Sequence, residues 1–292
     1  EEALFTDETL KQKEQADSYV YSVLDMDKTD YGMDDDKTIG EELISRTNTK
    51  RYIVTTDANG GTIYVRNNLD VKVVGITGSV GKTSTKETIS SVLSEKYRVL
   101  KTLGNFNNEI GLPLTVFRLT EDDEVAVLEM GISDFGEMER LSKIAQPDIC
   151  VITNIGLCHL ENLGTRDGIL KAKTEIFNHM NPDGIVILNG DDDKLSTISQ
   201  VHGKRPLVFG ISNKDGVYAD NIKSLGLDGT SFTIHGIKTA DNYSTFDLTV
   251  PVPGHHMVYN AMAAALVGSV LGLSSIEIER GVKNLKTIAG RN

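Results

Sequence analysis

The stretch that decides the fold is Gly75-Ile76-Thr77-Gly78-Ser79-Val80-Gly81-Lys82-Thr83-Ser84. The apolar run before it, 71–74, is typical of a buried strand, and Ile89, Val92 and Leu93 after it recur at helical spacing. A glycine-rich loop between a strand and a helix can bind phosphate through its backbone N–H groups and the helix N-terminus. The alternative is a plain Gly/Ser turn followed by a helix with an early lysine. The flanking strand and helix favour the nucleotide site.

Lys82 and Thr83 are the side chains of this loop that suit phosphate chemistry. The lysine would reach the terminal phosphates, and the threonine hydroxyl would bind Mg²⁺. The spacing Gly78-x-x-Gly81-Lys82-Thr83 is two residues shorter than that of the common phosphate loop. We predict that the nucleotide-binding residues of the loop are Gly78, Ser79, Gly81, Lys82, Thr83 and Ser84.

The composition narrows the classes of partner. The chain has 292 residues, of which 39% are hydrophobic and 25% charged, as in ordinary globular proteins. Its formal net charge of −12 argues against a nucleic-acid surface or an anionic membrane as partner. No apolar run approaches the roughly 20 residues that span a bilayer. The two cysteines, Cys150 and Cys158, suggest no disulfide framework, so we expect a protein of the reducing cytoplasm.

From residue 71 onward, predicted strands alternate with predicted helices, which indicates a mostly parallel sheet covered on both faces. The predicted strands are 71–76, 98–101, 125–129, 149–153, 185–189 and 206–209. The predicted helices are 82–95, 109–119, 136–145, 168–180, 192–202, 257–271 and 275–285. A small antiparallel β extension on the sheet edge is predicted from strands at 217–225, 231–235 and 243–250. The expected fold is α/β, with its site at the carboxyl ends of the parallel strands.

Residues 1–70 form a separate, atypical or shortened N-terminal region in this prediction. Helices are possible at 4–21 and 38–46, and strands at 51–56 and 62–66 would form a hairpin. The acidic segment 25–37 could hold a metal, but a solvated run of charge is the better interpretation.

Beyond the loop, five polar residues stand where chemistry is possible. Glu129 ends an apolar strand, where a carboxylate could bind Mg²⁺, although a solvated strand-end glutamate explains it equally well. Asn107 and Asn108 would ordinarily cap a helix. His159 lies in a loop, where histidines are more often structural than catalytic. Lys173 lies on a predicted helix, where it would ordinarily face solvent.

Five ordered segments together resemble the ATP-dependent Mur ligases, over residues 71–291 of this chain. The segments are 75–87, 104–113, 128–131, 154–161 and 172–177. Within the family, Asn-Asn-Glu-Ile-Gly-Leu-Pro at 107–113 favours the members that add D-alanyl-D-alanine to UDP-N-acetylmuramoyl-tripeptide over the folylpolyglutamate synthetase relatives.

The resemblance implies a catalytic and metal-binding set. Lys82 would bind phosphate, and Thr83 would bind Mg²⁺ beside the β- and γ-phosphates. Glu129 and His159 match the second metal site of the family. Lys173 matches a lysine that is carbamylated in the family, and a carbamate is an anion that can hold Mg²⁺. The implied catalytic residues are Lys82, His159 and Lys173.

The resemblance also implies contacts to nucleotide and substrate. Asn107 and Asn108 match a polar loop that faces both, and Asn260 matches the asparagine that binds the adenine edge. Arg291 matches a hinge arginine near the γ-phosphate. Met257 departs from the family pattern, because the family usually has an asparagine there.

The reaction that the resemblance implies is amide formation through an acyl-phosphate. The carboxylate of a UDP-muramoyl-peptide would attack the γ-phosphate of ATP, and the amine of D-alanyl-D-alanine would then displace phosphate. We expect a monomer. The alternatives are a Mur-type ligase with a different acceptor, and a nucleotide-binding module without ligase turnover.

The resemblance divides the chain into two parts. Residues 71–292 would form the central ATP-binding domain. Residues 1–70 show no typical uridine-nucleotide domain, and the C-terminal domain of the family is absent from this chain. We therefore expect the 292-residue chain to bind ATP and to ligate very weakly or not at all.

Overall fold

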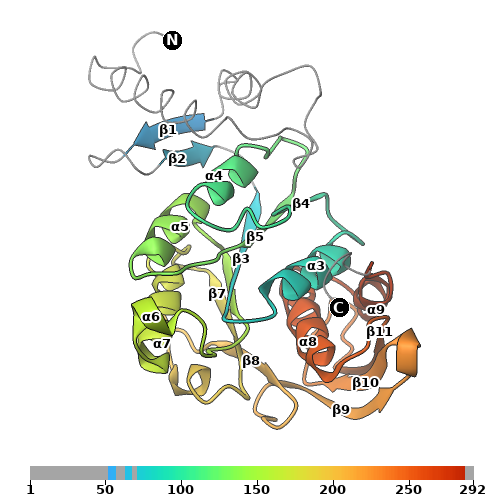
Figure 1. Cartoon of the computed structure of the whole chain (residues 1–292). Coiled ribbons are helices and arrows are strands. Elements are labelled where there is room, and N and C mark those ends of the chain that lie inside the picture. Colours follow the sequence, from blue (N-terminus) through green and yellow to red (C-terminus); the bar gives the residue numbers. More distant parts are fainter. Residues whose placement is uncertain (1–51, 57–62, 68–70, 287–292) are drawn as a thin grey trace.

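A computed structural model describes residues 52–56, 63–67 and 71–286, and a nine-stranded sheet forms the centre of this part (Figure 1). The strand order is β11-β10-β9-β8-β7-β6-β3-β5-β4. The strands of the parallel part are β3 (Lys72–Thr77), β4 (Val99–Lys101), β5 (Val125–Glu129), β6 (Ile149–Ile152), β7 (Ile185–Asn189) and β8 (Leu207–Gly210). All neighbours among them are parallel, as the alternating pattern predicts.

Strand β3 lies at the point where the chain changes direction across the sheet. It pairs with β5 on one side and β6 on the other. The chain runs from β3 outward to β4, returns to β5, and then crosses to β6. Open α/β sheets bind ligands at the carboxyl end of such a switch point, because the loops there diverge. The loop that follows β3 is therefore placed at the expected binding position.

The antiparallel extension continues the main sheet. Its strands are β9 (Val217–Ser224), β10 (Thr230–His235) and β11 (Thr245–Val250). Strand β9 pairs in parallel with β8, and β10 pairs antiparallel with both β9 and β11. A short 3-10 turn, η5 (Gly226–Asp228), joins β9 to β10. The predicted extension on the sheet edge is confirmed.

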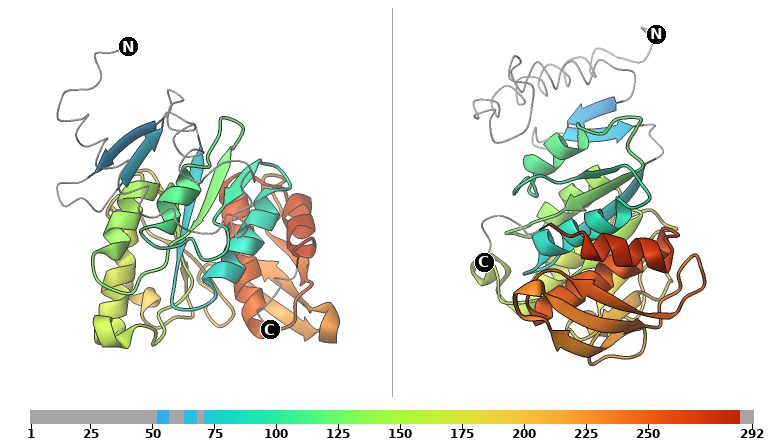
Figure 2. Two further views of the ribbon diagram at one scale, coloured as in Figure 1. Left: turned by 45° about the horizontal axis from the view of Figure 1, so that its top comes forward. Right: turned by 90° about the vertical axis from the view of Figure 1, so that its right-hand side faces the viewer.

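Helices cover both faces of the sheet (Figure 2). One face carries α3 (Lys82–Leu93), α8 (His255–Val270) and α9 (Ser275–Lys283), which also pack on one another. The other face carries α4 (Gly111–Val116), α5 (Glu137–Ala145) and α7 (Arg166–Thr174). Short turns complete this layer, namely α6 (Leu160–Leu163), η3 (Glu175–Phe177) and η4 (Leu195–Thr197).

The strands alternate between the two hydrophobic clusters because successive side chains point to opposite faces. In β5, Val125 and Val127 join the cluster under α3 and α8, whereas Ala126 and Leu128 join the cluster under α4 and α5. All four are buried. This double burial explains why the parallel strands are continuous apolar runs in the sequence.

Helix α8 is apolar on nearly every side, unlike the amphipathic α5. It is packed against α3, α9 and the strands of the extension, so little of its surface faces water. Helix α9 begins with a capping box in which Ser274 and Glu277 exchange side-chain to backbone hydrogen bonds. None of the helices in the described part of the chain is long and apolar enough to cross a membrane.

The predicted helix at 192–202 is wrong. Only η4, at 195–197, forms there. The carboxylate of Asp192 accepts hydrogen bonds from the N–H groups of Lys194 and Leu195, and its other oxygen accepts from Ile155. These bonds cap a single turn, and the backbone becomes extended at Ile198, so no α-helix follows. The predicted helix at 109–119 is shorter in the structure, where it is α4. The predicted helix at 168–180 corresponds to α7, which begins at Arg166, and to the η3 turn that follows it.

The predicted hairpin before residue 71 is confirmed. Strands β1 (Tyr52–Thr56) and β2 (Ile63–Asn67) pair antiparallel, and β2 lies against α4 and α5 (Figure 1). The expected helices at 4–21 and 38–46, the acidic segment 25–37 and Arg291 lie outside the described residues.

Candidate functional site

The loop between β3 and α3 is built on two glycines with positive φ. Gly78 has φ 150° and Gly81 has φ 82°. A Cβ at Gly78 would lie 1.9 Å from Oγ1 of Thr153, so no larger residue fits without displacing the loop after β6. Gly81 is the N-cap of α3 in the left-handed region, where glycine is least strained. The chain therefore enters α3 with its first N–H groups open to the loop.

The loop is fixed by the segment that follows β6. The Ser79 N–H donates to the carbonyl oxygen of Asn154 at 3.0 Å, and the Val80 N–H donates to Oδ1 of Asn154 at 3.0 Å. The Gly156 N–H donates to Oγ of Ser79 at 2.8 Å. The hydroxyl of Thr153 donates to the carbonyl oxygen of Val80 at 2.8 Å. Four contacts across neighbouring strands thus preorganise the phosphate-binding loop.

Lys82, the first residue of α3, lies over the loop. Its Nζ donates to the carbonyl oxygen of Gly78 at 2.9 Å. The ammonium group is therefore held beside the loop, at the N-terminal end of α3. Because the Ser79 and Val80 N–H groups are bonded to Asn154, the groups suited to a phosphate chain are the lysine and the N-terminus of α3.

Glu129 ends β5 beside the loop and is 3% exposed. Its Oε1 accepts hydrogen bonds from Oγ1 of Thr83 at 3.2 Å and from Nδ2 of Asn107 at 2.9 Å. A Cβ at Gly131 would lie about 3.0 Å from the Asn107 side chain, so this glycine permits the close approach. The alternative of a solvated strand-end glutamate is ruled out by the burial.

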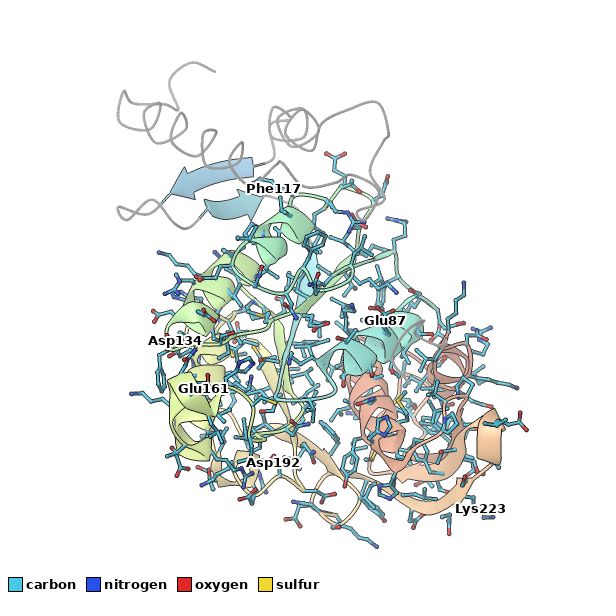
Figure 3. The ribbon with its side chains drawn as sticks, in the orientation of Figure 1. Glu87, Phe117, Asp134, Glu161, Asp192 and Lys223 are labelled. Carbon is cyan, nitrogen blue, oxygen red and sulfur yellow. The ribbon has the colours of Figure 1, made fainter. Side chains whose placement is uncertain are left out.

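Lys86, one turn after Lys82 on α3, faces the same carboxylate. Its Nζ lies 3.7 Å from Oε2 of Glu129 and 3.1 Å from Oε1 of Glu87. Glu87 is labelled on α3 in Figure 3 and also pairs with Lys101 of β4. Among the described residues, no hydrogen-bond donor reaches Oε2 of Glu129.

The oxygen atoms around Glu129 fit a small divalent cation. Mg²⁺ prefers carboxylate and hydroxyl oxygens, and Oε2 of Glu129 is buried with unused acceptor capacity. Thr83 brings its hydroxyl to the same carboxylate. The residues that could hold the cation are therefore Thr83 and Glu129.

Lys173 is buried on α7 and is 2% exposed. Burial, together with the nearby charge of Lys82, lowers the pKa of Lys173 to about 7, and the Cys158 thiol acts weakly in the opposite direction. No carboxylate among the described residues forms an ion pair with it. The ordinary solvent-facing position of a helix lysine is excluded, because α7 buries this residue together with Ile169 and Ala172.

His159 is exposed and occupies the N-cap of α6 with φ 61°. No hydrogen bond or ion pair joins it to Glu129. Within the described residues, no group of three or more His, Cys, Asp or Glu side chains is gathered as a metal site. The structure therefore brings Thr83, Glu129 and Asn107 together and leaves His159 outside this group.

Asn260 lies near the start of α8 and is buried. Its Oδ1 accepts a hydrogen bond from Oγ1 of Thr85 at 2.9 Å, and its Nδ2 donates to Sδ of Met257 at 3.3 Å. Met257 therefore contacts the Asn260 amide from the position where the family pattern has asparagine. Asn260 also lies close to the loop, because a Cβ at Gly81 would be 3.7 Å from its Oδ1.

The two asparagines of the 104–113 loop have different contacts. Asn107 reaches Glu129, whereas Oδ1 of Asn108 accepts from the N–H groups of Ile110 and Gly111 at the start of α4. The helix-capping interpretation thus describes Asn108. It does not describe the Asn107 side chain.

Lys86 was missed by the sequence-based reasoning. The signal was present, because Lys82, Lys86, Ile89 and Leu93 follow the spacing of one helix face, and Ile89 and Leu93 are core residues. A lysine on a core-facing stripe requires a buried partner.

The chain matches the family described as "Mur ligase middle domain" over residues 76–268. It is 44% identical over 223 residues to the UDP-N-acetylmuramoyl-tripeptide–D-alanyl-D-alanine ligase of Bacillus subtilis. The aligned part covers 76% of this chain and 46% of that ligase. MurF of Acinetobacter baumannii aligns with a TM-score of 0.71 at 36% identity, over 77% of this chain and 48% of that one.

The MurF ligase of Thermotoga maritima, solved in complex with ADP, aligns with a TM-score of 0.67 at 32% identity. The alignment covers 77% of this chain and 50% of the Thermotoga chain. This chain thus spans about half the length of the curated relatives it matches.

Proposed function

Because the chain belongs to the Mur ligase family, we propose that it carries the ATP-binding site of a ligase that adds D-alanyl-D-alanine to UDP-N-acetylmuramoyl-tripeptide in peptidoglycan precursor synthesis. The observation that carries the proposal is that Thr83, next to Lys82 after the glycine-rich loop, and Asn107 both donate hydrogen bonds to Glu129. The relative from Bacillus subtilis is named as a ligase of this kind. The ADP in the Thermotoga structure supports ATP as the nucleotide.

The residues of the chain have separable tasks in this proposal. The N-terminus of α3 and Lys82 bind the β- and γ-phosphates and offset the charge that gathers as the substrate carboxylate attacks the γ-phosphate. Thr83 and Glu129 would hold Mg²⁺. When bound there, Mg²⁺ would neutralise phosphate oxygens and orient the γ-phosphate for transfer. The amine of D-alanyl-D-alanine then attacks the acyl-phosphate, and an amide and phosphate result.

Lys173 is proposed to act as a carbamate. A neutral amine attacks CO₂ through its lone pair, forms an N–C bond and loses one proton. The lowered pKa of Lys173 provides a substantial neutral fraction near pH 7. The product is an anion among the cationic groups of the site, where it would serve as a further Mg²⁺ ligand.

The carbamate is testable by ¹³C NMR. Incubation with ¹³C-bicarbonate should give one protein-bound carbamate resonance, which the variant Lys173→Met should lack. Lys171→Met is the matched control, because Lys171 is exposed on the same helix, and it should keep the resonance. A wild-type spectrum without a carbamate resonance would contradict the assignment.

Further contacts complete the proposal. Asn260 would bind the adenine edge, Asn107 and Asn108 would face nucleotide and substrate, and Arg291 would approach the γ-phosphate. His159 would join a second metal site only if its loop moved toward Glu129. We propose a monomer that works in the cytoplasm, with residues 71–292 as the central ATP-binding domain.

The ligase assignment can be tested with a chimera. Residues 71–286 of this chain replace the corresponding middle domain of the Bacillus subtilis ligase, and phosphate release is measured with ATP, UDP-N-acetylmuramoyl-tripeptide and D-alanyl-D-alanine. We expect release that requires all three substrates and falls by at least a hundredfold in Lys82→Ala. Turnover with another acceptor or amine, and none with these, would reject the proposed substrates.

A further inference from the structure

Lys86 is a buried charge that the proposed reaction does not use. It is 1% exposed and among the largest fully buried side chains of the described residues. A buried ammonium is strongly unfavourable unless it is paired. Its position one turn after Lys82 places it between the phosphate loop and the core.

The contacts of Lys86 are unequal. Its Nζ lies 3.1 Å from Oε1 of Glu87, which is within hydrogen-bond range. It lies 3.7 Å from Oε2 of Glu129, which is an ion pair without a hydrogen bond. The neutral donors Thr83 and Asn107 both bond to the other oxygen, Oε1. Lys86 therefore faces the Glu129 oxygen that the neutral donors leave unused.

The charges form an alternating chain from the sheet edge to the loop. Lys101 of β4 pairs with Glu87, Glu87 with Lys86, and Lys86 with Glu129. The formal charge of these four groups sums to zero. Lys82 adds a positive charge beside the loop. Without a bound polyanion, the surroundings of Glu129 are therefore not anionic.

We propose that Lys86 is the internal counter-ion of Glu129, a positioning residue that fixes this carboxylate and makes divalent-cation binding depend on nucleotide. The inference rests on the proposed role of Glu129 as a cation ligand. A divalent cation on Glu129 must come within a few ångströms of the Lys86 ammonium, and at such distances like charges repel strongly in a protein interior. The phosphates of a nucleotide supply the negative charge that overcomes this repulsion.

The test is Mn²⁺ binding, followed by the electron paramagnetic resonance signal of free Mn²⁺ at pH 8, with and without ADP. Wild type should bind Mn²⁺ weakly alone and at least tenfold more tightly with ADP. Lys86→Met removes the charge at similar length, so its affinity for Mn²⁺ alone should rise at least tenfold. Lys86→Arg keeps the charge and should stay within threefold of wild type.

Two variants exclude simpler explanations. Lys101→Met removes an equal charge from the other side of Glu87 without touching Glu129, so its Mn²⁺ affinity should change less than twofold. The double variant Lys86→Met with Glu87→Gln has the same net charge as wild type, and it should still bind Mn²⁺ alone at least tenfold more tightly than wild type, which excludes an effect of net charge. Lys86→Gln keeps a neutral donor toward Glu129 but removes the charge, and it decides the question if Lys86→Met does not fold.

The outcomes separate this inference from the proposed function. Wild type that fails to bind Mn²⁺ even with ADP would overturn the cation site on which both rest. Normal Mn²⁺–ADP binding by wild type, with no gain in nucleotide-free affinity in the folded Lys86 variants, would overturn the role of Lys86 alone. Weaker Mn²⁺ binding in these variants, with and without ADP, would overturn it as well.

Discussion

The α3 side and the α7 side of the site each bury one lysine, and the two lysines have opposite surroundings. Lys86 on α3 is 1% exposed and lies within 4 Å of two carboxylates, those of Glu87 and Glu129. Lys173 on α7 is 2% exposed, has no carboxylate partner among the described residues, and lies near the cation of Lys82. The two lysines are therefore equally buried, but one lies beside negative charges and the other beside a positive charge.

The difference shows that a lysine's role is decided by its neighbours. Beside two carboxylates, an ammonium serves as a fixed charge. Without such neighbours, burial favours the neutral amine, which is the form that reacts with CO₂. The two lysines can thus supply a cation and a nucleophile from helices on opposite faces of the sheet.

The largest effect is expected from Lys86→Met. The change leaves the buried Glu129 without its cation, and breaking a buried pair from one side typically costs about 3 kcal/mol or more of unfolding free energy. The variant Lys86→Met with Glu129→Gln should recover most of that loss, because no buried charge remains unpaired. Urea denaturation measures both values.

Lys101→Met is the control for this prediction. Its side chain is 38% exposed, and exposed ion pairs contribute about 1 kcal/mol or less. If Lys86→Met were as stable as wild type, the ion pair with Glu129 would be energetically unimportant, and the contrast with Lys173 would lose its basis.

A smaller effect on stability is expected from Lys173, and it comes from a buried amine that has no carboxylate partner among the described residues. The pKa of Lys173 is about 7 in the folded chain and near 10.5 when unfolded. Between these values the unfolded state binds more protons, so the unfolding free energy rises with pH, by about 2 kcal/mol from pH 7 to pH 9. Below pH 7 both states are protonated, and the folded state carries the full penalty.

Lys173→Met should remove this pH-dependent contribution. In CO₂-free buffer, the unfolding free energy of the variant should therefore fall by about 2 kcal/mol relative to that of wild type between pH 7 and pH 9. For Lys171→Met, on the exposed side of α7, the difference should not change over this range. A constant difference for Lys173→Met would mean that its amine titrates as in water.

Much of this architecture was predictable from local patterns in the sequence. The apolar strands and the loop at 75–84 predicted the parallel sheet and its binding edge. Strands buried on both faces are continuous apolar runs, and a tight loop with positive φ needs glycine, so both features are visible in the sequence. The helix at 192–202 was predicted wrongly: Asp192 caps a single turn as it would cap a helix, and no local signal shows that the chain becomes extended at Ile198.

The site was less predictable, because its chemistry depends on contacts between distant residues. Glu129 and Asn107 are 22 positions apart, and no local pattern indicates that their side chains meet. The burial of Lys173 does have a local signal, since Ile169, Ala172 and Ile176 mark the buried side of its helix. Its lack of a carboxylate partner has no such signal, since that depends on what α7 packs against.

The smallest effect is expected from Asn107→Ala. The change removes one neutral donor from Oε1 of Glu129 and leaves Thr83 and Lys86 in place, so we expect a loss of about 1.5 kcal/mol in unfolding free energy, the lower end for a hydrogen bond to a charged group. Asn162→Ala, which removes an exposed amide hydrogen bond to the Ser133 carbonyl away from Glu129, is the control. It should lose less stability in urea, about 0.5 kcal/mol, and only Asn107→Ala should weaken Mn²⁺–ADP binding, by a few-fold. A loss in Asn107→Ala as large as that in Lys86→Met would show that neutral donors, rather than the ammonium, hold the carboxylate, and the contrast between the two lysines would then be one of packing.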